Sequence, residues 1–163
     1  MTDELVNIHI RGLPVPLHAR SQAHGDELMR EFRLLAEQMR QEGTDGLPTR
    51  LIELVNALEG QYSAFTEAQE DELDRAIQAG DETIELTYAL PASVGEGVAA
   101  LSAILDEVDE LCRQGQYLLT LATPPDLVAY RHWFLDEFTR QIAGERPLTW
   151  ADSPQGRLAA TPG

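Results

Sequence analysis

Histidines are the side chains of this sequence best suited to acid–base or metal chemistry, and there are four: His9, His18, His24 and His132. A metal site needs such ligands at helical or strand spacing, together with an acidic ligand. His18 and His24 are six residues apart, which does not place them on one helix face. His132 and Asp136 are four apart and share a face, but such a pair commonly makes only a local hydrogen bond. The spacing therefore predicts neither a metal site nor a bound cofactor.

The nucleophiles of the chain lack partners that would activate them. No Gly-x-Ser-x-Gly elbow occurs. Cys112 falls on the apolar stripe of a predicted helix, which indicates a buried, inert thiol. Gly95 and Gly97 could cradle a phosphate at a helix N-terminus, but the third glycine of the dinucleotide fingerprint is missing and Glu96 would repel an anion. No catalytic residue is therefore predicted.

Charge narrows the classes of function. The chain has 28 acidic residues against 12 arginines, no lysine, and a formal net charge of −16. The lack of lysine excludes P-loop and Schiff-base chemistry, and the negative charge disfavours binding to nucleic acid or anionic lipid. No run of about 18 apolar residues occurs, and the acidic N-terminus lacks the features of a signal peptide. We expect a cytoplasmic protein that binds neither nucleic acid nor membranes.

Two segments are candidates for contact with another protein. Asp106, Asp109 and Glu110 lie in the C-terminal half of a long predicted helix, where the helix dipole disfavours negative charge. The cluster is either a solvated face or a patch for an Arg- or Lys-bearing partner. Arg131 and Trp133 lie off the apolar stripe of the last predicted helix, and an exposed Trp beside an Arg is a typical interface anchor. The alternative is that this tryptophan packs against the C-terminal segment.

Hydrophobic periodicity predicts the elements that carry these residues. Alternation over 6–10 and 83–90 predicts two strands, and the apolar segment 117–122 predicts a third. If the first two strands are neighbours, they present a polar sheet face. Helical spacing and Gly or Pro breaks predict five helices, over 17–41, 48–60, 66–80, 93–115 and 125–142.

The predicted fold class is α+β, with a small sheet of about three strands packed against five helices in two layers. The element order is β-α-α-α-β-α-β-α, and the strand–helix–strand stretch over 83–122 should form a right-handed parallel crossover. Residues 1–150 are expected to form this single domain. The Pro-, Gly- and Ala-rich residues 151–163 are expected to be a disordered tail.

Two quoted segments carry a resemblance to a known family. The first is VNIHIRGLPVPLHAR at 6–20, continuing to HGDELMREF at 24–32; the second is LLTLATPPD at 118–126, continuing to YRHWF at 130–134. Over about residues 5–150 the chain resembles a family of uncharacterised proteins of GC-rich bacteria. That family is associated with partner-switching signalling by anti-sigma factors, their STAS-domain antagonists and the phosphatases that act on them. The resemblance implies an accessory or adaptor role, because neither a kinase-like nucleotide site nor paired metal-binding aspartates are present.

The leading hypothesis is thus a non-enzymatic regulatory or adaptor protein acting by protein–protein interaction. Its partner would be an anti-sigma or STAS-type regulator, and the protein could also form a homodimer. The alternative is a small-molecule-binding protein or enzyme with a pocket between the sheet and the helices, near His9, His18 and His132.

Overall fold

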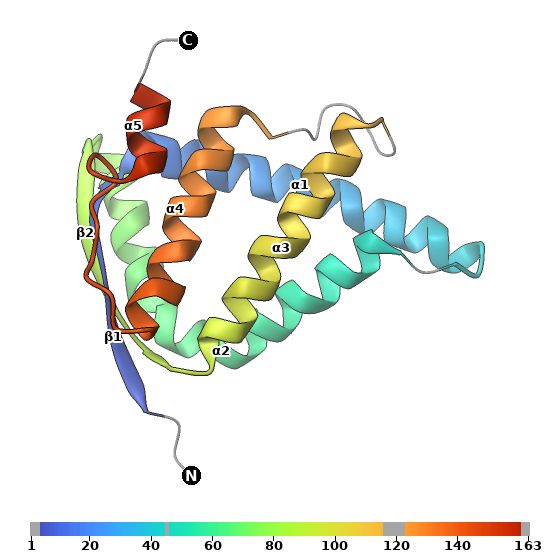
Figure 1. The fold of residues 1–163 in the computed structure, drawn as a ribbon. Helices are drawn as coiled ribbons and strands as arrows, with labels where there is room; N and C mark the ends of the chain where they lie inside the picture. The colour runs from blue at the N-terminus through green and yellow to red at the C-terminus, as the bar shows by residue number, and fades with distance from the viewer. Residues whose placement is uncertain (1–3, 45, 116–122, 161–163) are drawn as a thin grey trace.

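The computed structural model describes residues 4–44, 46–115 and 123–160 (Figure 1). In chain order, its elements are β1 (Leu5–Pro14), α1 (Val15–Gln41), α2 (Leu47–Ala79), β2 (Thr83–Pro91), α3 (Val94–Arg113), α4 (Pro125–Ile142) and α5 (Pro154–Ala160). Figure 1 shows the sheet at one side of the molecule and the long helices extending away from it. The predicted α+β class is confirmed. The described residues form five helices and a sheet of two strands, so the prediction of about three strands is wrong in that detail.

Strands β1 and β2 pair antiparallel, with Ile8 opposite Tyr88 and Ile10 opposite Leu86. The inward residues of both strands are buried, as the period-two alternation predicts. The register shifts between Ile10 and Leu13, where Gly12 adopts a φ of 62° in the left-handed region that glycine tolerates. The predicted third strand, and with it the parallel crossover, falls on residues 117–122, which lie outside the described residues.

Helix α2 covers both of the helices predicted over 48–60 and 66–80, which corrects the predicted element order. Gly60, the expected end of the first, lies within α2, and a Cβ there would meet nothing within 4 Å. A glycine inside a helix costs only about 1 kcal/mol. Tyr62 and Leu73 are both buried against the sheet cluster, and burial of such side chains outweighs that cost.

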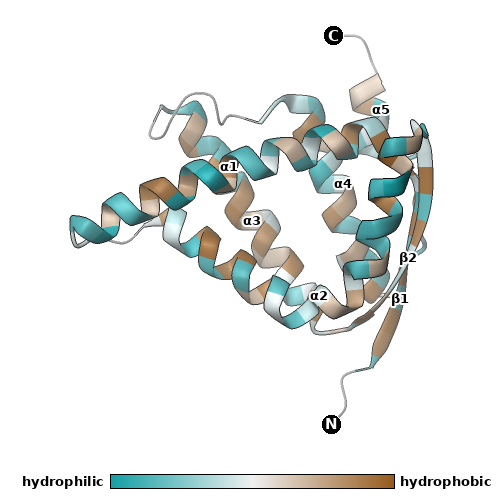
Figure 2. Cartoon of the chain, turned by 180° about the vertical axis from the view of Figure 1, so that it is seen from behind, coloured by the Kyte–Doolittle hydropathy of each residue, from teal (hydrophilic) through white to brown (hydrophobic). Residues whose placement is uncertain are grey.

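The helices and the sheet bury two apolar clusters. The sheet cluster joins β1 and β2 to α4 and to part of α2, and includes Ile8, Leu86, Leu73 and Phe138. The helix cluster joins α1, α2 and α3 far from the sheet, and is centred on Phe32, Leu51, Val108 and Cys112. Figure 2 shows apolar segments on both strands and along α3, and hydrophilic segments at the end of α1 farthest from the sheet. The burial of Cys112 agrees with the inert thiol predicted from its spacing.

Glutamine side chains cover backbone groups at both outer edges of the sheet. Gln141 of α4 exchanges two hydrogen bonds of 2.8 Å with the N–H and C=O of His9 on β1. These groups therefore point away from β2, and so do those of Thr87, which faces His9 across the pair. Gln69 of α2 donates to the Thr87 carbonyl at 2.7 Å. Helical side chains thus occupy positions that neighbouring strands would otherwise fill.

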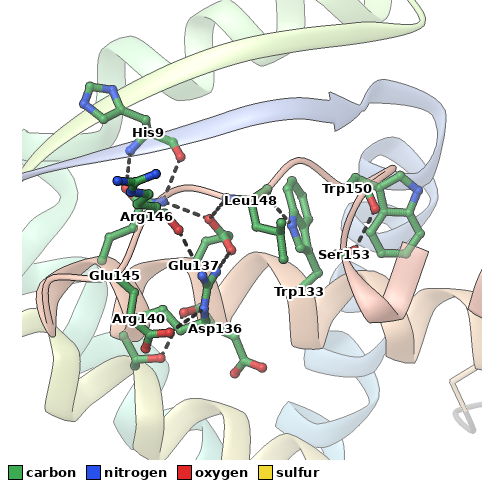
Figure 3. Close-up of polar contacts among 12 residues, drawn as sticks. His9, Trp133, Asp136, Glu137, Arg140, Glu145, Arg146, Leu148, Trp150 and Ser153 are labelled. Carbon is green, nitrogen blue, oxygen red and sulfur yellow. Dashed lines mark hydrogen bonds and ion pairs between the residues drawn. The ribbon is translucent and has the colours of Figure 1, made fainter. Parts of the chain in front are cut away.

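The segment after residue 150, for which composition predicts a disordered tail, includes helix α5 at Pro154–Ala160. Helix α5 begins after Ser153, whose buried Oγ accepts from the N–H of Gly156 at 2.9 Å, a helix N-cap bond. The Trp150 and Trp133 rings lie 5.7 Å apart (Figure 3). Composition resembling a disordered linker therefore hides a local cap and an aromatic anchor.

Candidate functional site

Trp133, for which the sequence left open an exposed anchor or packing against the C-terminal segment, is buried. Its side chain is 2% exposed, and its Nε1 donates to the Leu148 carbonyl at 2.9 Å. It packs edge-on against Trp150. Trp133 therefore packs against the C-terminal segment, which is the second of the two alternatives. The chain after α4 turns back and covers a face of α4 that lies outside its apolar stripe.

The three carboxylates Asp106, Asp109 and Glu110 do not form one exposed patch. Asp109 is 3% exposed and lies 2.8 Å from the guanidinium of Arg131. The same guanidinium contacts Asp106 at 2.6 Å, while Glu110 pairs with Arg113 at 2.7 Å. Asp106 and Glu110 remain exposed at the surface, but each already has a cationic partner. The predicted partner-binding residues are mostly engaged within the molecule.

The three histidines of the predicted pocket do not converge. His9 lies on β1, where its Nδ1 is 3.1 Å from the hydroxyl of Thr87 on β2. His132 lies on α4 and pairs with Asp106 at 2.7 Å. Only His18 lines a cavity, and it does so together with His24, which the sequence interpretation set aside. The cavity therefore extends partly around α1, because His18 and His24 lie on different sides of that helix and both line the cavity.

The central cavity, as we call it, has a volume of about 550 Å³ and lies among α1, α2, α3 and α4, with Tyr88 of β2 in its wall. Its apolar wall draws on both clusters, because Leu73 and Phe138 belong to the sheet cluster and Leu28 and Leu105 to the helix cluster. The cavity therefore lies where the two cores meet. Its volume falls within the range of about 300–1,000 Å³ typical of small-molecule sites.

A neutral polar pair lies in the cavity wall. The Tyr130 hydroxyl is 2.8 Å from Nδ1 of His18. Burial lowers the pKa of His18, against an opposing effect of the Asp74 charge. Burial also raises the pKa of Tyr130 well above its usual value. Near neutral pH the pair is therefore uncharged, and it can offer a hydrogen bond to a ligand without adding charge.

A chain of hydrogen bonds and ion pairs runs from the cavity wall to the surface. The Thr123 hydroxyl donates to Asp109 at 2.5 Å and lies 3.0 Å from Nε2 of His24. A hydroxyl has one proton, so His24 must donate to the Thr123 oxygen, which assigns the His24 proton to Nε2. Arg131 continues the chain from Asp109 to Asp106. Since His24 acts here as a donor, it does not activate Thr123 as a general base would.

The carboxylates at the rim of the cavity are different, because they form no ion pair with any residue that the structure describes. Glu70 and Asp74 lie one turn apart on α2, both are exposed, and both line the cavity. None of the ion pairs found between described residues involves either of them. Partial burial and the charges of Glu59 and Asp74 raise the pKa of Glu70. The cavity thus combines an interior in which the Arg131 charge is offset by two aspartates with a negative rim.

The sequence carried one signal for this site that the interpretation missed. His18, Ser21, Gln22, Gly25 and Leu28 recur at helical spacing along α1, and all of them line the cavity. A stripe of small and polar residues that ends in a leucine marks a helix face next to a space rather than next to a packed core. The contributions from α2, β2 and α4 come from distant parts of the chain and carry no such periodic signal.

Two features that the described part of the chain lacks bear on the site. No group of three or more His, Cys, Asp or Glu side chains is arranged to hold a metal ion there. No helix among those residues is both long and apolar enough to cross a membrane.

Comparisons of the chain with protein-family models, with curated proteins and with solved structures find no match. What the site can do is therefore inferred from its own geometry.

Proposed function

We propose that this protein is a non-enzymatic regulatory protein that binds a small molecule in the central cavity. The observation that carries the proposal is the cavity itself, of about 550 Å³, with an apolar wall and a few convergent polar groups. That combination is the usual form of a ligand site, in which apolar contacts supply affinity and polar groups fix orientation. The role resembles the sequence-based hypothesis in being regulatory, but it rests on a different surface.

The position of the cavity gives a physical route from binding to regulation. A ligand in contact with Leu28 and Leu105 on one side and with Leu73 and Phe138 on the other would join the two apolar clusters. A ligand that binds only the folded state stabilises that state in proportion to the logarithm of its concentration. Binding would therefore fix the packing of α1 and α3 relative to the sheet, and a partner could detect that change.

The site geometry favours binding over turnover. His18 is paired with Tyr130, and His24 donates to Thr123 rather than accepting its proton. Neither histidine is therefore positioned as a general base beside a nucleophile within the described cavity wall.

A cavity-filling variant tests the proposal. Leu105→Trp should fill the space beside α3, whereas Leu34→Trp makes the same change at a leucine that is 70% exposed. A thermal-shift screen of small molecules should find compounds that raise the melting temperature of the wild type and of Leu34→Trp, but not of Leu105→Trp. Leu101→Trp, at another wall position, provides a second test if Leu105→Trp does not fold. Compounds that stabilise all variants equally, or no stabilising compound at all, would overturn the proposal.

A protein partner is the second candidate, and the exposed carboxylates of α2 favour it. Glu59, Glu67 and Asp71 are exposed on this helix, and their charges act on Glu70 at the rim of the cavity. Such a face favours a basic partner surface and speeds the encounter with it. An anti-sigma or STAS-type regulator, which the family resemblance implies, remains the proposed partner. Charge reversal at Glu67 and Asp71 should weaken binding to such a purified regulator, and reversal at Glu110 should not.

A further inference from the structure

We propose that the ligand of the central cavity is an apolar molecule that carries a single protonated amine. Its ammonium group would lie at the rim between Glu70 and Asp74, and its apolar body would extend inward past His18 and Tyr130. This inference rests on the proposed function and adds the chemical class of the ligand.

Charge around the cavity is divided unequally between its two sides. On the α4 side, the positive charge of Arg131 is offset by Asp106 and Asp109, which it contacts at 2.6 and 2.8 Å. On the α2 side, Glu70 and Asp74 belong to none of the ion pairs found between described residues. The available charge of the cavity is therefore negative, and a cation entering there would meet two unpaired carboxylates.

An anionic ligand would meet the opposite conditions. Its charged group would face Glu70 and Asp74 at the rim, where like charges repel. Inside the cavity it would find His18 kept neutral by burial, and a guanidinium already engaged by two aspartates. The transfer of an unpaired carboxylate or phosphate into such an interior is costly. Fatty acids and nucleotides therefore do not fit the site.

The apolar wall limits the ligand to one cationic group. Beyond the rim, the wall combines leucines of four helices and aromatic rings with neutral polar side chains such as Ser21, Gln22 and Thr66. A second ammonium group carried inward would lose its hydration and find no carboxylate of the cavity wall beyond Glu70 and Asp74. A polyamine therefore fits poorly, whereas an aryl or alkyl monoamine places its charge at the rim and its carbon skeleton inside.

Aromatic rings give the cation and its neighbouring carbons further contacts. The rings of Tyr130 and Phe134 stack, with their centroids 6.0 Å apart. The Phe138 ring packs edge-on against those of Phe134 and Tyr88, and each of these pairs has its centroids 5.2 Å apart. All four rings line the cavity. Aromatic faces attract ammonium groups within about 6 Å and pack well against an aromatic ligand body.

Three probes with one body and three head groups test the inference: 4-phenylbutylamine, 4-phenylbutanol and 4-phenylbutyrate. Isothermal titration calorimetry on the full chain at pH 7.5 and low salt should give an affinity for the amine about tenfold higher than for the alcohol. The butyrate should bind most weakly. Raising the salt concentration should reduce the preference for the amine and leave the alcohol almost unchanged.

A matched pair of variants locates the charge. Glu70→Gln combined with Asp74→Asn should reduce the amine affinity to that of the alcohol. Glu67→Gln combined with Asp71→Asn makes the same change on the same helix at residues outside the cavity wall, and it should leave most of the preference intact. Equal binding of amine and alcohol, or an unchanged preference in the Glu70 and Asp74 variant, would overturn the inference but leave the proposed function standing. Failure of all three probes, while other compounds bind in the thermal-shift screen, would do the same.

Discussion

Gln141 and His9 lie 132 positions apart in the sequence, and the Gln141 side chain pairs with the His9 backbone as a neighbouring strand would. Its Nε2 also donates to the buried carboxylate of Glu137 at 2.9 Å. That carboxylate accepts from the Leu148 N–H at 3.1 Å and pairs with Arg140 (Figure 3). One buried polar network therefore joins β1, α4 and the chain that follows α4.

Replacing Gln141 by Met should destabilise the protein by about 2–4 kcal/mol, because both backbone groups of His9 would lose a buried hydrogen-bond partner. Urea unfolding followed by circular dichroism measures the change in the free energy of unfolding. Gln78→Met, at an exposed position of α2, is the matched control and should change it little. Equal effects of the two substitutions would show that the Gln141 bonds contribute no specific stability.

Glu137→Gln tests the centre of the same network. The substitution keeps the shape of a side chain that is 1% exposed, but it removes the negative charge and replaces one of two accepting oxygens by an NH2 group that can only donate. Oε1 faces Arg140 and Oε2 accepts from Gln141 and Leu148, so either orientation of the new amide places donor against donor on one side. We expect a loss of about 2–4 kcal/mol in urea unfolding. Glu145→Gln, an exposed neighbour of the same arginine, should cost well under 1 kcal/mol, in line with about 0–1 kcal/mol for surface pairs. Similar losses from both variants would contradict the network.

Two glycine-to-alanine substitutions should have opposite effects: one should disturb the packing of α5, and the other should stabilise α2. A Cβ at Gly156 would lie 1.8 Å from the Trp150 carbonyl oxygen, so Gly156→Ala should displace α5 and shift the tryptophan fluorescence to longer wavelength. A Cβ at Gly60 meets nothing within 4 Å inside α2, so Gly60→Ala should raise stability by about 0.5–1 kcal/mol. If Gly60→Ala destabilises the protein, α2 is not one continuous helix in solution.

The stability of the folded protein should decrease as the pH falls, and part of that decrease should come from His18. Burial lowers the pKa of His18 in the folded protein below its ordinary value of 6.5. Its contribution is therefore complete above pH 6.5 and is lost as the pH falls below that value, because the unfolded chain takes up the proton first. His18→Asn keeps a neutral polar group near Tyr130 and should flatten the loss of stability between about pH 7 and pH 5. His9→Asn should leave it unchanged, and equal pH profiles for the wild type and His18→Asn would refute the assignment.

The sequence predicted the elements with strong periodicity and missed the features that depend on distant contacts. The alternation in β1 and β2 and the apolar stripes of α1, α3 and α4 identified those elements within a few residues. The continuity of α2 through Gly60 was missed because local propensity favoured a break, and burial of Tyr62 and Leu73 outweighed it.

The site was harder to predict than the fold. The sequence left open whether Trp133 is an exposed anchor or packs against the C-terminal segment, because the chain after α4 returns to cover it and a helical wheel does not contain that segment. The predicted pocket combined His18 with His9 and His132. His18 does line the central cavity, but His9 and His132 are not part of its wall. The cavity is lined from four helices and one strand, and no local pattern brings those segments together.

The two glutamines at the sheet edges have a consequence for how the protein behaves at high concentration. A strand from another molecule could hydrogen-bond to the backbone of His9, or to the Thr87 carbonyl, only by displacing the amide of Gln141 or Gln69. Uncovered edges are the usual starting points of aggregation and of fibre growth. By covering these points with side chains from its own helices, a sheet of only two described strands resists becoming a template for polymerisation.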